Sequence, residues 1–428
     1  MRAKRTLLAL ALPFALLLPA ACGGADEGGG DSGTLRILTN LPDSDSKGKQ
    51  LTTIIANFQK ANPGVKIERE DAPAPEEAHN RYEQAKLAGN EPDIVITNLF
   101  GKPTSWLDNG ATVDVAKDAK DWGLESLFLP EALNAWRKPD GRLQGFPWEG
   151  FTWPVWYNLD LLNKAGVAKV PTTTDELIDA TKKLRAAGIQ PIVTGGKDWS
   201  GNKLFSLIVE SMTTDEQALA AFRDGAWDTP EVKAGIELFT KLRDAGVFTD
   251  SAEGLTADQQ RSTFGAGKAA IMHGGSWDYG SADIPTAKNA NIELGGFPLA
   301  PSSTRQKPVI YTDFTATGVW ISPKGQDKAA TVEKFVKHLY TPESLGLLVE
   351  AGALAPVADD KVKVDKSTLP KLYVQASEKL KATTEVAVLS DVHVPTKSQT
   401  GFERATSLAF TPGTSADDII KALKQAWQ

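Results

Sequence analysis

The chain has 428 residues, of which 41% are hydrophobic and 24% are charged, a composition typical of a soluble globular protein. Its formal net charge of −7 argues against a nucleic-acid-binding protein. A single cysteine excludes an internal disulfide framework and a thiolate metal cluster, and four scattered histidines argue against a histidine-rich metal site. We therefore expect no metal and no cofactor.

The N-terminus has the three parts of a secretory signal. Basic residues come first, an apolar run over 7–18 follows, and small residues lead to Cys22. The run is too short to cross a bilayer as a helix. The junction resembles the bacterial lipobox, whose cysteine is lipidated; the alternative is an ordinary signal peptide with an incidental cysteine. We expect a signal peptide over 1–21, lipidation of Cys22 and a flexible glycine-rich tether over 22–33.

The next segment alternates strand and helix patterns. A strand is predicted over 34–39, and apolar residues at helical spacing over 51–58 predict a helix that Pro63 ends. Further elements are a half-buried strand near 65–67, a polar helix near 75–88 and a buried strand over 94–96. This alternation predicts a parallel sheet in an α/β fold.

The remainder is mostly helical. Thr173 and Glu176 predict a capping box, and Thr229 before Pro230 predicts another helix start. A strand is predicted over 269–273. Later apolar patterns predict helices over 327–339, 343–351, 369–382 and 415–427. No second apolar run is long enough to cross a membrane.

Five phrases, in the same order as in the family, carry a resemblance. The chain resembles the extracellular solute-binding proteins of carbohydrate ABC importers, of the maltose/oligosaccharide-binding type. The phrases are FQKANPGVKIE (58–68), PDIVITN (92–98), VWYNLDLLNKAGV with PTTTDEL (155–177), TFGAGKAAIMHGGSW (263–277) and GVWISPKGQDKAATVEKFVKHLYTPESLGLLVEAGALAPV (318–357).

The resemblance implies a two-lobed α/β fold of the periplasmic-binding-protein type II, with the ligand in a cleft between the lobes. Lobe one would comprise 34–147 plus 273–316, and lobe two 148–272 plus 317–428. The chain would cross between lobes near 146–156, 273–276 and 315–320. The resemblance further implies a monomeric, non-enzymatic receptor outside the cytoplasm, anchored to the membrane through Cys22, that hands a sugar or oligosaccharide to the permease subunits of the importer.

A sugar site should combine aromatic rings with polar side chains. Sugar C–H faces suit the electron-rich face of a ring, and sugar hydroxyls need partners because a buried unpaired polar group costs roughly 1–3 kcal/mol. The segment 146–158 has this mixture at the first expected crossing. Its candidates are Trp148, Glu149, Phe151 and Trp153, and core packing is the alternative for each aromatic residue.

The other candidates lie in loops or at strand ends. Trp277 is the foremost because it follows Gly274, Gly275 and Ser276, where the resembling proteins have a stacking tryptophan and where glycines permit close approach. The remaining candidates either bind ligand or have a structural or solvated role, and they are Asp278, Trp199, Asp43, Asp45, Asn98, Tyr311, Asp313 and Phe314. Segment 390–402 is a further candidate lining of lobe two.

Two other functions remain open from the residues alone. An exported glycan hydrolase would use two carboxylates at a fixed separation, for which Glu149 with Asp278 or Asp313 are conceivable. No other hydrolase motif occurs in the sequence. A receptor for a non-sugar solute, such as a polyamine, would surround aromatic rings with carboxylates.

Overall fold

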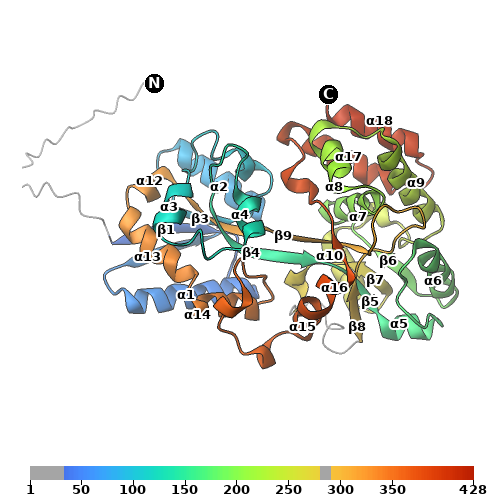
Figure 1. Cartoon of the computed structure of the whole chain (residues 1–428), viewed down its shortest axis with the longest axis horizontal. Helices are drawn as coiled ribbons and strands as arrows, with labels where there is room; N and C mark the ends of the chain where they lie inside the picture. Colours follow the sequence, from blue (N-terminus) through green and yellow to red (C-terminus); the bar gives the residue numbers. More distant parts are fainter. Residues whose placement is uncertain (1–32, 280–290) are drawn as a thin grey trace, which may run out of the picture. The chain divides into compact units, whose positions relative to one another are not determined.

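The computed structural model describes residues 33–279 and 291–428, and its strands form two sheets (Figure 1). One sheet has the order β10-β9-β3-β1-β2 with β4 added beside β9, and the other has the order β6-β7-β5-β8. The expected signal peptide, Cys22 and nearly all of the tether fall in 1–32, outside the described residues. In the part of the chain that is described, no helix combines the length and apolarity needed to cross a bilayer.

The first sheet begins as the sequence predicts. β1 pairs in parallel with both β2 and β3, which confirms the predicted parallel order. Asp45 starts α1 by accepting a hydrogen bond from the Gly48 amide at 2.7 Å. The elements of this part are β1 (Thr34–Thr39), α1 (Ser46–Ala61), β2 (Lys66–Asp71), α2 (Pro75–Leu87), β3 (Ile94–Thr97), η1 (Lys102–Ser105), α3 (Ala116–Asp121) and α4 (Pro130–Trp136).

A second series of elements builds the four-stranded sheet and the helices around it. The capping box of Thr173 and Glu176 is present at the start of α6. The elements are β5 (Val155–Asn158), α5 (Leu159–Lys164), α6 (Thr174–Ala186), β6 (Gln190–Val193), α7 (Trp199–Glu210), α8 (Asp215–Asp224), α9 (Pro230–Asp244), η2 (Ala252–Gly254), α10 (Ala257–Gly265), β7 (Ala269–His273), η3 (Ser276–Asp278) and β8 (Ile292–Gly295).

The C-terminal third of the chain adds elements to both the first and the second series. β9 (Val309–Ile321) leads to three helices that join the first series: α12 (Pro323–Gln326), α13 (Ala329–Leu339) and α14 (Pro342–Glu350). The elements after them are η4 (Asp359–Lys361), η5 (Lys366–Thr368), α15 (Lys371–Gln375), the π-helix η6 (Ala376–Leu380), α16 (Lys381–Thr383), β10 (Glu385–Val386), η7 (Ser390–Val392), α17 (Thr396–Ala409) and α18 (Ala416–Ala426).

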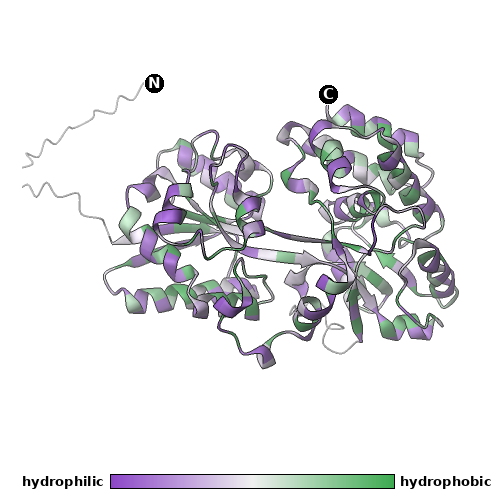
Figure 2. Cartoon of the chain, viewed as in Figure 1, coloured by the Kyte–Doolittle hydropathy of each residue, from purple (hydrophilic) through white to green (hydrophobic). Residues whose placement is uncertain are grey.

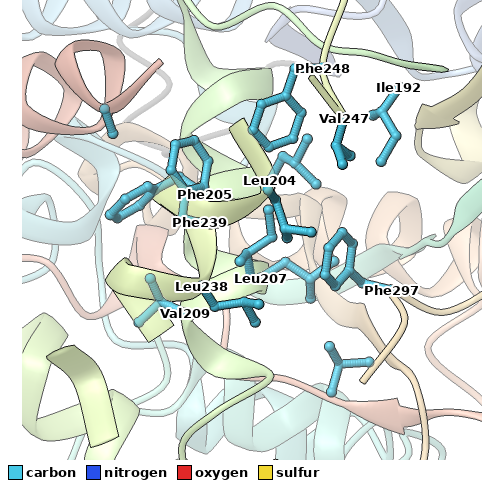
Figure 3. Close-up of a cluster of buried hydrophobic side chains, with 14 of the residues drawn as sticks. Ile192, Leu204, Phe205, Leu207, Val209, Leu238, Phe239, Val247, Phe248 and Phe297 are labelled. Atoms are coloured by element: carbon cyan, nitrogen blue, oxygen red, sulfur yellow. The ribbon is translucent and has the colours of Figure 1, made fainter. Parts of the chain in front are cut away.

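The two series bury separate hydrophobic cores. We call the cluster that includes Ile37, Val95 and Phe335 the first core. The second core includes Leu204, Phe239 and other side chains from α7, α9 and β6 (Figure 3). A smaller third cluster lies on the four-stranded sheet and includes residues of β7, β8 and α15. Figure 2 shows hydrophilic and hydrophobic segments on most helices, as expected for helices that bury one side.

β4 (Phe146–Trp153) and β9 pair antiparallel and contribute to both cores. Phe146 and Trp148 belong to the first core, whereas Phe151 and Trp153 belong to the second. The pairing shifts register on both sides of Glu149. This irregular pairing therefore lies between the residues of β4 that join the first core and those that join the second.

The expected lobe boundaries differ from this arrangement in the second half of the chain. The resemblance predicts that 273–316 belongs to the lobe of 34–147, but β7 and β8 pair with β5 and their side chains pack in the second and third clusters. It also predicts that 317–428 belongs to the lobe of 148–272, but side chains over 319–357 pack in the first core. Only the part from Leu372 onward packs with the second series.

The physical reason is strand pairing. β7 is held in the middle of the four-stranded sheet by β5 and β6, so the chain stays with that sheet at 273–276. The return to the first core is made by β9, which pairs with β3 at Gly318–Ile321. A third passage lies between Val357, which packs in the first core, and Leu372, which packs in the third cluster.

Two local predictions have different outcomes. The helix start at Thr229 and Pro230 is confirmed, with Thr229 as the N-cap residue of α9, although the Thr229 side chain makes no capping hydrogen bond. The single helix expected over 369–382 is interrupted by the π-helical turn η6 between α15 and α16.

Candidate functional site

Four aromatic side chains from three elements meet beside β4. The ring centroid of Trp153 lies 5.0 Å from that of Trp277 and 5.4 Å from that of Trp199, and both pairs are edge-to-face. Phe151 lies 5.8 Å from Trp277, and Trp199 lies 6.1 Å from Trp277. We call these four residues, Phe151, Trp153, Trp199 and Trp277, the aromatic cluster.

The members of the aromatic cluster differ in exposure. Phe151 and Trp153 are buried, Trp277 is half-buried, and Trp199 is 42% exposed. The exposed fraction of Trp199 matters because its ring lies beside the half-buried Trp277, so that the two together offer aromatic surface to solvent. Two rings therefore form the base of the cluster, and two offer area to solvent.

Local sequence explains how Trp199 and Trp277 reach this position. Asp198 caps α7 by accepting a hydrogen bond from the Ser200 amide at 3.1 Å, which makes Trp199 the first residue of the helix. The ring of Trp277 folds back over Gly275, where a Cβ atom would collide with it. The glycine is thus required for this placement of the indole.

His273 supports the base of the cluster. Its ring is stacked on Trp153 with a centroid distance of 5.1 Å and an interplanar angle of 15°. Burial lowers the pKa of His273 to about 3, so the imidazole is neutral under ordinary conditions. The neutral imidazole of His273 therefore packs against Trp153 and brings no charge to the site.

Charged side chains lie next to the aromatic cluster. Lys203 is one helical turn after Trp199, on the same side of α7, and is 5% exposed. Its ammonium group forms an ion pair with Asp391 at 2.7 Å and donates hydrogen bonds to Asn202 Oδ1 at 3.1 Å and Ser390 Oγ at 3.4 Å. The pair links α7 to η7.

Two further carboxyl groups are affected by Asp391. Burial, with a smaller contribution from Asp391, raises the pKa of Asp313 to about 6, although the Thr315 amide donates to it at 2.8 Å. Burial also raises the pKa of Glu403, which Lys203 opposes and Asp391 reinforces. Carboxylates outnumber cations in this group.

Several buried polar atoms near these residues have no hydrogen-bond partner among the described residues, and they include both ring nitrogens of His273. Two others are the indole Nε1 of Trp153 and the Oδ2 oxygen of Asp391, one donor and one acceptor. Because a desolvated polar group without a partner is costly, both atoms favour a bound molecule that both donates and accepts hydrogen bonds.

Tyr311 and Phe314, both predicted from the sequence, are buried in β9. Tyr311 lies 6.2 Å from Trp153 between ring centroids and donates its hydroxyl to Glu210 Oε1 at 2.8 Å. The carbonyl of Phe314 accepts a hydrogen bond from Trp136 Nε1 at 2.7 Å. These contacts place Tyr311 behind the aromatic cluster and Phe314 between the two cores.

The structure places Trp148 and Glu149 away from the aromatic cluster. Trp148 is fully buried in the first core. Glu149 forms an ion pair with Lys47 of α1 and accepts a hydrogen bond from Thr317 Oγ1 at 2.8 Å. Glu149 thus connects β4, β9 and α1 at the register shift.

The remaining predicted residues have partners within the chain. Asp43 forms an ion pair with Arg69 at 3.1 Å, Asp45 caps α1, and Asp278 forms an ion pair with Arg261 at 3.4 Å. Asn98 accepts a hydrogen bond from the Phe100 amide at 3.4 Å.

Sequence reasoning missed Lys203 and Glu403 and found Asp391 only as part of segment 390–402. The position of Lys203 four residues after Trp199 was an available signal, but the surrounding helix is apolar and reads as core. Contacts between α7 and η7 join residues 188 positions apart, which no local pattern encodes.

Two cavities lie elsewhere in the part of the chain that the structure describes. A cavity of 430 Å³ lies between α5, β8 and α16, and one of 340 Å³ lies beside α2, and neither includes a member of the aromatic cluster. Over 33–279 and 291–428, no group of three or more His, Cys, Asp or Glu side chains could hold a metal ion.

Comparisons with known proteins agree on one family. The model of the bacterial extracellular solute-binding proteins matches residues 53–382. A probable sugar-binding periplasmic protein of Rhizobium meliloti (strain 1021) is 31% identical over 197 residues, 45% of this chain and 46% of that protein. The sn-glycerol-3-phosphate-binding periplasmic protein UgpB of Salmonella typhimurium is 31% identical over 164 residues, 36% of each chain. The chain thus matches less than half the length of these curated relatives.

A solved structure extends the likeness to nearly the whole chain. A probable secreted solute-binding lipoprotein from Streptomyces coelicolor is 36% identical, with a TM-score of 0.82 over 93% of this chain and 99% of that one. Together with the two sheets, this confirms the expected two-lobed α/β fold.

Proposed function

Because the chain belongs to the bacterial extracellular solute-binding proteins, which bind solutes outside the cytoplasm without acting on them as enzymes, we propose that it captures a sugar for an ABC importer. The bound sugar would lie against the aromatic cluster. Permease subunits in the membrane are the partners that such a receptor requires. The family assignment leaves no role for the exported hydrolase considered from the sequence.

The observation that carries this proposal is the composition of the site. Trp199 and Trp277 offer ring surface to solvent, while Trp153 Nε1 and Asp391 Oδ2 offer an unpaired donor and an unpaired acceptor. A sugar presents apolar C–H faces together with hydroxyl groups that both donate and accept. The four features match these two surfaces of a sugar.

The likeness to one named relative raises a second ligand, glycerol phosphate. The charges in the site argue against it. Asp391 acts electrostatically on both Asp313 and Glu403, and Lys203 forms an ion pair with Asp391. These carboxylates would repel a phosphate dianion, so a neutral sugar fits the site better.

The arrangement of β4 and β9 supports hinge closure as the working motion. Each strand carries residues of both cores, and their pairing is irregular at Glu149. Closing two rigid bodies about such a segment is a common switching motion. Ligand contacts made only in the closed state would shift the open–closed equilibrium toward closure.

The N-terminus would keep this receptor at the membrane. We propose that Cys22 carries lipid after removal of 1–21 and that the glycine-rich residues up to 33 separate the anchor from the folded part. Two acyl chains on one cysteine suffice for stable anchoring. A monomer fits this role, since one copy would present one ligand to one permease.

A thermal-shift screen tests the proposal. The probes are D-galactose, maltose, raffinose, xylobiose and N,N′-diacetylchitobiose, with sn-glycerol 3-phosphate and spermidine as non-sugar probes. Since a ligand that binds only the folded state stabilises it, at least one sugar should raise the melting temperature. A rise with spermidine or glycerol phosphate and with none of the sugars would contradict sugar binding.

Trp277→Ala is expected to weaken binding of the sugar that scores in this screen. Loss of the stacking surface should cost on the order of 1–3 kcal/mol of affinity, by analogy with aromatic stacking on nucleic-acid bases. Titration calorimetry measures the change. Trp427→Ala is the matched control, because Trp427 is also half-buried but packs on Trp227 near the C-terminus. Equal affinities of the two variants would refute the stacking role.

A further inference from the structure

Asp391 has one oxygen engaged and one oxygen available. Its Oδ1 atom lies 2.7 Å from the Lys203 ammonium nitrogen, while its Oδ2 atom is buried and has no hydrogen-bond partner among the described residues. The side chain as a whole is 25% exposed, although the Oδ2 atom itself is buried in this structure. A buried oxygen without a partner favours a bound molecule that supplies a hydrogen-bond donor.

Lys203 fixes this orientation. The ammonium group is held by three oxygens, from Asn202, Ser390 and Asp391, and it has only three protons to donate. Its side chain is 7% exposed and cannot follow the carboxylate if Asp391 turns. The ion pair therefore fixes the plane of the carboxylate and leaves one of its two oxygens unpaired.

The location of Asp391 connects it to the aromatic cluster. Lys203 lies one turn from Trp199 on α7, and the hydroxyl of Tyr311, whose ring faces Trp153, lies 3.5 Å from the Lys203 carbonyl. Asp391 also raises the pKa of Asp313, which is paired across the strands with Phe151. Asp391 is thus close to the groups behind and beside the rings.

On the basis of the proposed sugar-binding function, we propose that Asp391 is a specificity-determining residue whose Oδ2 atom accepts a hydrogen bond from a hydroxyl of the bound sugar, with Lys203 as its positioning residue. The acceptor is ionised and desolvated, so the hydrogen bond is charge-assisted and stronger than one between neutral groups. A ligand that presents an acceptor or an anion at this point is rejected, because two acceptors face each other.

Asp391→Asn gives the sharpest test because the amide has the shape of the carboxylate. The amide must turn its oxygen toward the Lys203 ammonium group, and its NH₂ group then occupies the place of Oδ2. The variant therefore replaces an acceptor by a donor without leaving a cavity. We expect affinity for the sugar identified in the screen to fall about ten- to hundredfold, the range for a lost charge-assisted hydrogen bond.

The matched control is Asp417→Asn, which removes the same charge at the exposed ion pair between Asp417 of α18 and Lys233 of α9. Calorimetric titration of the wild type and both variants, with melting temperatures taken without ligand, separates binding from folding. Wild-type affinity in Asp391→Asn would overturn the assignment of Asp391 and leave the sugar-binding function standing. Absence of sugar binding by the wild type would overturn the function and the assignment together.

A second measurement tests the positioning role of Lys203. Lys203→Met should weaken sugar binding in the wild-type background but have less effect in the Asp391→Asn background, since the orientation it enforces no longer matters there. Such non-additivity in a double-mutant cycle is the sign of a direct coupling. Additive losses would show that Lys203 acts on the fold alone and would overturn its role in orienting Asp391.

Discussion

Glu210→Gln is expected to stabilise the protein near pH 8 and to have little effect near pH 5. Glu210 is the last residue of α7 and is fully buried. Burial raises the pKa of its carboxyl group to about 8, against the lowering effect of the Tyr311 hydroxyl and the Val388 amide. The folded chain therefore holds this proton at a pH where the unfolded chain has released it.

The neutral acid can also be accommodated by the groups around Glu210. Its proton would reverse the hydrogen bond of 2.8 Å in which Tyr311 donates to the carboxylate, and Tyr311 would then donate to the carbonyl of Lys203 at 3.5 Å. The other carboxyl oxygen accepts a hydrogen bond from the Val388 amide at 2.7 Å. Glutamine can make the same contacts, with its NH₂ group donating to Tyr311 and its oxygen accepting from Val388.

The sign of the pH dependence follows from the raised pKa. Stability from this group is complete below the unfolded-state pKa near 4.5, falls as pH rises, and is lost once pH passes the folded-state value of about 8. Each pH unit in this window corresponds to about 1.4 kcal/mol, so the gain in Glu210→Gln at pH 8 should reach ~2–4 kcal/mol.

Urea unfolding of wild type and Glu210→Gln at pH 5, 6, 7 and 8 measures this gain. The difference in unfolding free energy between the two proteins should grow with pH. Glu216→Gln is the control, since Glu216 lies on the exposed side of α8. A difference that stays constant from pH 5 to pH 8 would show that Glu210 is ionised throughout.

Elements were predictable where local sequence determines them. The parallel strands β1, β2 and β3 follow from apolar runs separated by helical patterns, and the capping box at Thr173 follows from two residues three positions apart. In each case the interacting groups are close in sequence. Local patterns of this kind require no knowledge of the rest of the chain.

The distribution of late segments between the cores was not predictable in the same way. α13 and β8 both carry apolar residues, and nothing in either segment says which core will bury them. Long-range strand pairing, of β9 with β3 and of β8 with β5, determines which core buries each segment. The resemblance to a family predicts that there are two lobes. It does not predict as well the residues at which the chain passes from one lobe to the other.

The candidate site shows the same division. Trp153, Trp199 and Trp277 were proposed from glycine-rich or mixed aromatic surroundings, and the structure brings the three rings together. The sequence alone does not single out Lys203 and Asp391, because their role depends on an ion pair between distant segments. Aromatic composition can be noticed in a sequence, whereas the pairing of buried charges requires coordinates.

Trp153→Ala should destabilise the protein by about 3–5 kcal/mol, the usual cost of truncating a buried aromatic side chain. Trp153 is 4% exposed, its ring is stacked on His273, and it contacts both Trp199 and Trp277 edge-to-face. Removal of the indole leaves a cavity under the two exposed rings, and these rings lose the surface that orients them. Chemical denaturation without ligand measures the loss.

Trp199→Ala provides the contrasting result. Trp199 is 42% exposed, so its truncation should change the unfolding free energy by about 1 kcal/mol or less while still reducing sugar affinity. If Trp153 supports the site and Trp199 contacts the ligand, Trp153→Ala should lose mainly stability, whereas Trp199→Ala should lose mainly sugar affinity. Equal losses of stability in both would mean that Trp199 is part of the core, and its exposed face would then have no part in binding. Because the two rings touch, the double variant should lose less stability than the sum of the single losses, which connects the packing of Trp153 to the placement of Trp199.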